Sequence, residues 1–369
     1  MIAFVLGTRP ELIKVSPVVH ELARRGVPVE IVHTGQHYTA ELDAVFFDEL
    51  DLPAPRANLR VGSLCSLKQL GAMLSGLQDA LTERRPRVIV VQGDTNSVLA
   101  GALAGHKLDI PVAHLEAGLR SDDWTMPEEG NRVLAGRVAA VHFCPTDLQA
   151  ARLASEGITR GVYVVGNTAV DACTTFADKA RRTSGIRRRL DLTDRRFALL
   201  TMHRPSNVDE PARLRALLAC LSDLARAHDT RIVFPVHPRT RESLRRHGME
   251  LALWPLLLPT EPLGYLDMLA LMQSAEFVLT DSGGAQEEAC TLRIPCVTLR
   301  PNTERPETVT VGANLLYSGV DPAELGAHLD VMLANERNWP NPFGDGRAAQ
   351  RVADVLLDPT TRWLPSGQP

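Results

Sequence analysis

Acidic side chains that follow strand-like runs are the residues of this chain best suited to proton transfer. They are Asp94, Glu116 and Glu128, and Asp94 comes shortly after the apolar run Val88–Gln92. Because the carboxyl ends of parallel strands meet at one edge of a sheet, these carboxylates are expected to face the same region. Carboxylates in one site shift one another's pKa values, so that one serves as an acid and another as a base. For Asp94 alone, a role in capping the next helix is an equally good interpretation.

A glycine-rich turn in the second half of the chain offers a different kind of chemistry. The apolar run Phe277–Thr280 is followed by DSGG at 281–284, where a helix is predicted to begin. Glycines let a ligand approach the backbone, and the free N–H groups at a helix start attract phosphate. Glu287 or Glu288 in the first turns would accept hydrogen bonds from a ribose diol. The alternative is an ordinary serine-capped helix with glutamates near its positive end.

Cations and histidines stand at the remaining predicted loop positions. The segment GTRPELIK near the start carries Arg9 and Lys14, which face either a ligand or solvent. His203 follows an apolar run, where an imidazole can meet a phosphate or protonate a leaving group, and Arg120 is close enough in sequence to balance Glu116. The histidines and acids lack the spacing of metal ligands, so no metal is expected in the chemistry.

Short aliphatic runs alternate with segments of helical periodicity, which predicts an α/β fold with parallel sheets. The runs expected to form strands are Ile2–Leu6, Val29–His33, Val88–Gln92, Val112–Leu115, Val141–Cys144, Val162–Val165, Phe197–Thr201, Ile232–Val236, Phe277–Thr280 and Cys296–Leu299. We place one Rossmann-like domain at 1–170, a second at 171–357 whose last helix returns towards the first, and a tail at 358–369. Two such domains are expected to face a shared cleft.

The composition is that of a globular protein without excess positive charge. The chain has 369 residues and a formal net charge of −4, which argues against nucleic-acid and anionic-membrane partners. Its 6 cysteines form no close pairs, so reduced and mostly buried thiols are expected. The first apolar run is too short for the core of a signal peptide, and no run is long enough to span a membrane. We therefore expect a cytoplasmic protein.

Seven motifs occur in order along nearly the whole chain and together carry a resemblance to a known family. They are GTRPELIK, QGDTNSVLAG, HLEAGLRS, MPEEGNR, MHRPSN, DSGGAQEEA and TERPE. The chain thereby resembles the non-hydrolysing UDP-N-acetylglucosamine 2-epimerases. The resemblance implies a two-domain glycosyltransferase-B-like fold, a homodimer, and interconversion of UDP-N-acetylglucosamine with UDP-N-acetylmannosamine for the synthesis of surface polysaccharide precursors.

The resemblance also implies roles for individual residues of this chain. The positions that match catalytic residues of the family are Asp94, Glu116, Glu128 and His203. The positions that match or adjoin residues near UDP are Arg9, Lys14, Arg132, His237, Ser282, Gly283, Gly284, Glu288 and Arg305. Considered by itself, His237 is better interpreted as structural or close to phosphate than as catalytic.

Inversion at C2 of such a sugar requires either oxidation at C3 or removal of the substituent at C1. Oxidation needs a nicotinamide, and no GxGxxG follows any predicted strand, so no cofactor is expected. Elimination of UDP needs only cations and helix ends that stabilise the charge of the leaving group. The sequence therefore favours loss of UDP to give a 2-acetamidoglucal, followed by re-addition of UDP with protonation from the opposite face.

Three other functions stay open at the level of sequence. A related epimerase for a UDP-2,3-diacetamido uronic acid would need an additional basic contact, which the sequence does not assign. A glycosyltransferase of the same fold would share the UDP-binding residues but would have no need for three acids in its first half. A non-catalytic nucleotide-sugar sensor would have little use for those acids.

One position departs from the pattern of the family. Members often have His-Arg-x-Glu-Asn where this chain has HRPSN at 203–207, so Ser206 replaces the usual glutamate. In bacterial relatives that are activated by their own substrate, that glutamate and a QHxxQ loop help to form an accessory site. The corresponding loop here has the sequence QHYT at 36–39. We therefore predict that substrate activation is weakened or absent.

Overall fold

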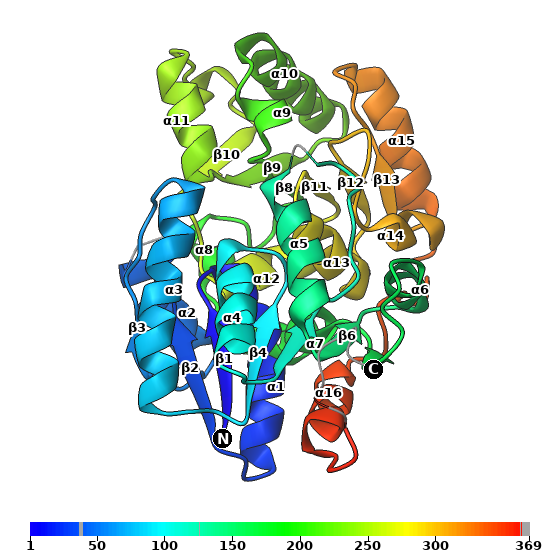
Figure 1. Cartoon of the computed structure of the whole chain (residues 1–369). Helices are drawn as coiled ribbons and strands as arrows, with labels where there is room; N and C mark the ends of the chain where they lie inside the picture. Colours follow the sequence, from blue (N-terminus) through cyan, green and yellow to red (C-terminus); the bar gives the residue numbers. More distant parts are fainter. Residues whose placement is uncertain (37–39, 125, 362, 364–369) are drawn as a thin grey trace. The chain divides into compact units, whose positions relative to one another are not determined.

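Residues 1–36, 40–124, 126–361 and 363 are described by the computed structural model shown in Figure 1. The chain divides into two compact units. The first unit comprises Met1–Ala172 and Phe343–Pro369, and the second unit comprises Cys173–Pro342. The division falls within helix α7 (Thr168–Thr183), and helix α16 (Ala348–Leu357) belongs to the first unit. Residues 362 and 364–369 of the expected tail lie outside the described residues.

A parallel sheet of seven strands forms the centre of the first unit, in the order β3-β2-β1-β4-β5-β6-β7. Its strands are β1 (Ile2–Leu6), β2 (Val29–His33), β3 (Ala57–Asn58), β4 (Val88–Gln92), β5 (Val112–Leu115), β6 (Val141–Cys144) and β7 (Val162–Val164). The central strands are continuous apolar runs because helices cover both faces of the sheet.

The helices of the first unit pack in two groups. They are α1 (Arg9–Arg24), α2 (Ala40–Glu49), α3 (Ser66–Glu83), α4 (Asn96–Lys107), α5 (Pro127–Val138) and α6 (Asp147–Ser155), together with the start of α7 and with α16. Helices α3, α4 and α5 lie side by side, and α1 contacts α2 and α16 (Figure 1). The buried carboxylate of Asp171 accepts hydrogen bonds from the amides of Ala348 and Ala349 at 3.2 and 2.8 Å, which fixes the start of α16.

The second unit contains a parallel sheet of six strands, in the order β10-β9-β8-β11-β12-β13. Its strands are β8 (Phe197–Thr201), β9 (Arg231–Pro235), β10 (Leu257–Thr260), β11 (Val278–Thr280), β12 (Cys296–Thr298) and β13 (Asn314–Leu316). Its helices are α8 (Ile186–Arg189), α9 (Pro205–Val208), α10 (Pro211–Ala227), α11 (Pro238–Arg246), α12 (Tyr265–Ser274), α13 (Gly283–Thr291), α14 (Pro306–Thr310) and α15 (Pro322–Ala334), with a 3-10 turn at Leu251–Leu253.

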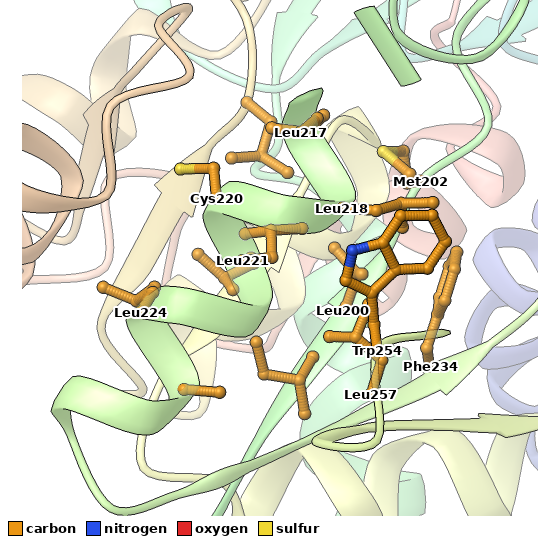
Figure 2. Close-up of a cluster of buried hydrophobic side chains, with 14 of the residues drawn as sticks. Leu200, Met202, Leu217, Leu218, Cys220, Leu221, Leu224, Phe234, Trp254 and Leu257 are labelled. Atoms are coloured by element: carbon orange, nitrogen blue, oxygen red, sulfur yellow. The ribbon is translucent and has the colours of Figure 1, made fainter. Parts of the chain in front are cut away.

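Helix α10 packs its leucine-rich face into the core of the second unit (Figure 2). Leu217, Leu221 and Leu224 lie on that face, spaced by three or four residues, and all are fully buried. Phe234 of β9 and Trp254 join the same cluster. The apolar face predicted for this helix is therefore confirmed.

The predicted α/β class with two parallel sheets is confirmed, but three strands were not predicted. These are β3, β10 and β13, all at sheet edges. These edge strands are short and only partly buried, so they lack a continuous apolar run. Strand β10 also contains Pro259, which is tolerated at a sheet edge. Of the cysteines, only Cys65 is exposed, and all six are free. Within the described part of the chain, no helix is long and apolar enough to cross a membrane.

Candidate functional site

Several predicted site residues lie in, or on the helices after, loops that flank the same topological position in each sheet. Both sheets contain the Rossmann order 3-2-1-4-5-6, in which the direction of chain progression reverses between the first and fourth strands. In the first unit the loops at this position follow β1 and β4, and they carry Lys14 and Asp94 on or beside their helices. In the second unit the loops follow β8 and β11, and they carry His203 and Ser282. Open α/β sheets bind their ligands at this position.

Glu116 directly follows β5 and has a strained backbone. Its φ angle is 61°, in the left-handed region that a residue with a Cβ seldom adopts. Lys14 Nζ lies 2.5 Å from Glu116 Oε1, and Gln92 donates a hydrogen bond to Oε2. Asn167 Nδ2 lies 3.5 Å from Oε1. Strain of this kind persists where surrounding contacts enforce it, and it is concentrated at functional sites.

The partner of Glu116 differs from the one expected from the sequence. Arg120 was expected to balance it, but the Arg120 guanidinium pairs with Glu156 through two hydrogen bonds of 2.8 Å each. Lys14, which comes from helix α1 and is 102 positions away in sequence, takes that place. The Lys14 side chain is 12% exposed and that of Glu116 is 7% exposed, so the pair is largely screened from solvent.

Asp94 accepts two hydrogen bonds from Arg132 of α5, at 3.0 Å from Nε and 2.6 Å from Nη2. The same guanidinium donates to Glu129 at 2.7 Å. Burial raises the pKa of Glu129, but the Ser121 amide and Arg132 lower it by more, so this carboxyl has a pKa below its usual value. The helix-capping alternative for Asp94 is wrong, because Thr95 is the N-cap of α4. Asp94 is therefore held by a cation, with 30% of its side chain exposed.

Glu128 and Arg9 have fewer constraints. Glu128 is half-buried in the first turn of α5, and none of the described residues donates a hydrogen bond to it. The Arg9 guanidinium lies over the ring of Phe46, 5.6 Å from its centroid. Both side chains belong to the first unit, together with Asp94, Glu116, Lys14 and Arg132.

Two buried titratable groups that the sequence did not single out fix the loop of Asp94. Glu11 accepts hydrogen bonds from the amides of Gly7 and Thr8 at 2.6 and 2.8 Å and from the Thr95 hydroxyl. Burial raises its pKa to about 7, although these donors act in the opposite direction. His114 Nε2 donates to the carbonyl of Gly93 at 2.7 Å, and burial lowers the pKa of this imidazole. Asp94 thus lies between two anchored neighbours.

In the second unit, His203 at the end of β8 meets the buried carboxylate of Asp281 at the end of β11. The His203 Nδ1 atom lies 3.2 Å from Asp281 Oδ1, with 34% of the histidine side chain exposed. The ring of His237, the N-cap of α11, lies 5.0 Å from the ring of His203. Asp281 was interpreted only as part of a glycine turn, because nothing local in the sequence shows which strand end its carboxylate approaches.

The start of α13 is open. Ser282 is its N-cap, with a side chain that accepts no capping hydrogen bond, and Gly283 and Gly284 are its first residues. A Cβ atom on either glycine would meet no described atom within 4 Å. Ser282 thus occupies the expected capping position, but its side chain does not make the capping hydrogen bond. The space that a ligand would need next to the two glycines is present. The first N–H groups of this helix are available to an anion.

The two glutamates of α13 differ in their surroundings. Glu287 is buried and pairs with Arg305. Glu288 is half-buried and interacts with Tyr265; burial, followed by the charges of Glu288 and Cys173, raises the pKa of this tyrosine well above its usual value. Of the two, Glu288 is the carboxylate with a partly exposed position.

The positions discussed for substrate activation are only partly described. Ser206 is exposed on the short helix α9. Gln36 is buried, and its Oε1 atom accepts hydrogen bonds from the amide and hydroxyl of Ser97 at 3.1 and 2.8 Å. His37, Tyr38 and Thr39 lie outside the described residues. The Gln36 side chain is thus committed to the start of α4.

The predicted site residues divide between the two units. The first group is Arg9, Lys14, Asp94, Glu116, Glu128 and Arg132, and the second is His203, His237, Ser282, Gly283, Gly284, Glu288 and Arg305. Among the described residues, no three His, Cys, Asp or Glu side chains lie close enough to hold a metal ion. The first group can move protons, and the second can hold an anion.

A family model, a curated relative and a solved structure all point to one family. The family model for UDP-N-acetylglucosamine 2-epimerase matches residues 20–357. The UDP-N-acetylglucosamine 2-epimerase of Methanocaldococcus jannaschii is 44% identical over 96% of this chain and 98% of its own length. A crystal structure of that enzyme with UDP-GlcNAc and UDP superimposes with a TM-score of 0.89 over 96% of this chain and 99% of the other.

Two more distant proteins bear on substrate and on fold. A UDP-2,3-diacetamido-2,3-dideoxy-D-glucuronate 2-epimerase of Pseudomonas aeruginosa is 37% identical over 95% of this chain and 98% of its own length. The crystal structure of a glycotransferase of kitacinnamycin has a TM-score of 0.58 at 14% identity, covering 99% of this chain and 98% of that one. The second likeness concerns the fold alone and agrees with the predicted glycosyltransferase-B-like fold.

Proposed function

This chain belongs to the UDP-N-acetylglucosamine 2-epimerase family, and we propose that it reversibly interconverts UDP-N-acetylglucosamine and UDP-N-acetylmannosamine by elimination and re-addition of UDP. The observation that carries the elimination route is Glu116, a carboxylate on a left-handed backbone in contact with Lys14. A strained, enclosed carboxylate is suited to hold one geometry against a substrate.

The bond changes balance without an external oxidant or reductant. A carboxylate of the first unit removes the proton from C2, and the electrons of that C–H bond form the C1=C2 double bond. The C1–O bond breaks at the same time, and its electron pair leaves on the phosphate oxygen of UDP. Re-addition of the same oxygen to C1, with a proton delivered to the other face of C2, gives the epimer. Asp94, Glu116 and Glu128 are the candidates for base and acid.

The second unit is proposed to bind UDP and to stabilise it as a leaving group. The open start of α13 at Ser282, Gly283 and Gly284 offers N–H groups to the phosphates. Glu288 is proposed to accept hydrogen bonds from the ribose. His203 is proposed to donate a proton to the leaving phosphate. Arg305, held by Glu287, is proposed to contribute positive charge near the nucleotide.

The remaining roles follow from the family rather than from contacts within this chain. We propose that His237, Arg9 and Arg132 lie near the nucleotide sugar, that the enzyme acts as a homodimer, and that it works in the cytoplasm. Its product is proposed to feed the synthesis of surface polysaccharide precursors. The 2,3-diacetamido uronic acid substrate is the second candidate, which the lower identity to the Pseudomonas aeruginosa enzyme makes less favoured than the first.

Proton NMR of the enzyme with UDP-N-acetylglucosamine in deuterated water tests the proposal. We expect deuterium to enter C2 while UDP-N-acetylmannosamine accumulates, since a proton leaves C2 and solvent deuterium replaces it. Epimer formation without deuterium at C2 would contradict elimination. Turnover only of the 2,3-diacetamido uronic acid nucleotide would replace the first substrate by the second, and release of a sugar onto an acceptor would indicate a glycosyltransferase.

A further inference from the structure

The carboxylate of Asp281 collects donors that come almost entirely from one loop. This side chain is 0% exposed. Its oxygens accept hydrogen bonds from the amide of His203 at 3.0 Å, from the amide of Arg204 at 2.9 Å and from Asn207 Nδ2 at 3.1 Å. All three donors lie between β8 and the end of α9. Burial raises the pKa of Asp281, but His203, Arg204 and Asn207 lower it by more, so this carboxyl is ionised at neutral pH.

The contact with the His203 ring is of a different kind from the contacts with the amides. Nδ1 of the ring lies 3.2 Å from Asp281 Oδ1. An ionised carboxylate only accepts hydrogen bonds, so Nδ1 must carry a hydrogen in this contact. The other ring nitrogen, Nε2, is then the atom through which His203 exchanges protons. The His237 ring, 5.0 Å away, restricts rotation of the imidazole from a second side.

Support of the loop alone does not require an acid at this position. Backbone amides and the Asn207 amide need only an acceptor oxygen, which a neutral asparagine also provides. Either oxygen of a carboxylate can accept the hydrogen bond from the Nδ1–H group of His203. An asparagine accepts it only through its oxygen, because its amide nitrogen is itself a donor. The contacts with the backbone therefore do not explain why residue 281 is an acid, whereas the contact with the His203 ring does.

We propose that Asp281 is a positioning residue for the epimerisation, which holds His203 with its Nδ1 atom protonated and its Nε2 atom free to act on the leaving group. This inference rests on the proposed elimination of UDP. For this transfer His203 carries a proton on both ring nitrogens: when the C1–O bond breaks, the Nε2 proton passes to the phosphate oxygen that receives the electron pair, and the neutral ring keeps its hydrogen on Nδ1. On re-addition the oxygen gives the proton back to Nε2. Asp281 accepts no proton in either direction and acts only through His203.

A double-mutant cycle tests whether Asp281 acts through His203. We expect Asp281→Asn to lower kcat by about 10²- to 10³-fold, within the range for loss of one general acid or its orientation. In a His203→Gln background the same substitution should change kcat by less than about threefold, because the group that it positions is already absent. Equal losses in both backgrounds would show that Asp281 only supports the loop.

Asn207→Ala is the matched control, because it removes a donor to the same carboxylate and leaves the histidine ring in contact with Asp281. It should lower Tm while keeping kcat within about tenfold of wild type, since the lost hydrogen bonds are structural. A loss of kcat as large as that of Asp281→Asn would contradict the proposal. UDP binding by each variant, measured by calorimetry, establishes that the second unit is folded.

The ring nitrogens report directly on the proposal. Nitrogen-15 NMR of histidine-labelled enzyme, recorded at a pH at which the ring is neutral, should place the hydrogen of His203 on Nδ1 in wild type and mainly on Nε2 in Asp281→Asn. An unchanged tautomer in a variant that still binds UDP would overturn the proposal. Deuterium exchange at C2 by the wild-type enzyme is measured in parallel; its absence would refute the elimination itself, independently of the outcome for Asp281.

Discussion

Asp94 and Glu116 of the first unit are carboxylates that each contact a cation, whereas His203 and Arg305 of the second unit are basic groups that each contact a buried carboxylate. The two sheets share the order 3-2-1-4-5-6. In the Asp94–Arg132 pair the more exposed member is the acid, whereas in the His203–Asp281 pair it is the basic group. One Rossmann-like framework thus carries the residues proposed for proton abstraction in one copy and those proposed for anion binding in the other.

The exposed fractions follow the same reversal. Asp94 is 30% exposed and its partner Arg132 is 9% exposed, whereas His203 is 34% exposed and its partner Asp281 is 0% exposed. In both cases the more exposed member is the one proposed to meet substrate. The buried member has to be charged, because an uncharged neighbour would leave its partner without orientation or compensation.

The largest expected effect comes from Glu116. Glu116→Gln should lower kcat by about 10³- to 10⁴-fold while UDP affinity stays within about threefold, because the carboxylate is proposed to act on C2 only. Steady-state kinetics and calorimetry with UDP measure the two quantities. Glu30→Gln is a matched control, since Glu30 is also paired with arginines on the same sheet. Near-normal turnover in Glu116→Gln would show that this carboxylate of the first unit does not act on C2.

Lys14 provides the next test. Lys14→Met should lower kcat by about 10²-fold, because Glu116 loses the cation that compensates it, and removing one partner of an enclosed pair also destabilises the fold. If Lys14 serves Glu116, the loss lies in kcat and UDP affinity is preserved. A loss confined to UDP affinity would show that Lys14 binds the anion and does not act as the partner of Glu116.

Because His33 at the end of β2 is buried, we expect the stability of the fold to fall at acidic pH. Burial lowers its pKa from the usual value of 6.5 to about 4. The unfolded chain therefore binds this proton more tightly, and the stability that neutral His33 contributes above pH 6.5 is lost as the pH falls towards 4. His33→Gln should reduce that loss by about 2 to 3 kcal/mol across the window, at about 1.4 kcal/mol per pKa unit.

Chemical denaturation of wild type and His33→Gln at both ends of the window measures this difference. Glu11, whose pKa is raised to about 7, acts with the opposite sign, but it is present in both proteins and cancels in the comparison. Parallel stability curves for the two proteins would contradict the prediction.

A smaller effect is expected at the open start of α13. Gly283→Ala meets no described atom within 4 Å, so the fold should be unchanged or gain about 0.5 to 1 kcal/mol from helix propensity. UDP affinity should nevertheless fall by about tenfold, because the added methyl group lies where a phosphate is proposed to approach. Gly71→Ala in α3, which also meets no described atom, should leave UDP affinity unchanged. Equal affinity in both variants would remove the glycines from the binding site.

The smallest effect concerns the shape of the rate curve. With Ser206 in place of the usual glutamate, the dependence of rate on UDP-N-acetylglucosamine should be hyperbolic, and UDP-N-acetylmannosamine should react without addition of its epimer. Initial rates over a range of substrate concentrations measure this. A sigmoidal curve, or an inert UDP-N-acetylmannosamine, would show that an accessory site persists without that glutamate.

The sequence predicted the central strands because strands buried on both faces are continuous apolar runs. It also placed the site residues after strands, where the switch points of the two sheets lie. It did not predict which charged residues pair. Lys14 and Glu116 are 102 positions apart, and the nearer Arg120 was the wrong choice. Asp281 was missed as a partner of His203 for the same reason, since their contact depends on the adjacency of β8 and β11.

The placement of α16 has a consequence for the order in which the chain matures. Asp171 binds the amides of Ala348 and Ala349, so the first unit is completed by a segment that leaves the ribosome only after the whole of the second unit. Domains fold as units during synthesis, generally starting with the N-terminal one. Until α16 has been synthesised, the face of α1 that α16 contacts stays uncovered. The second unit is the single segment Cys173–Pro342, so its whole chain has been synthesised before α16. The unit that is proposed to bind UDP is therefore the first that can finish folding.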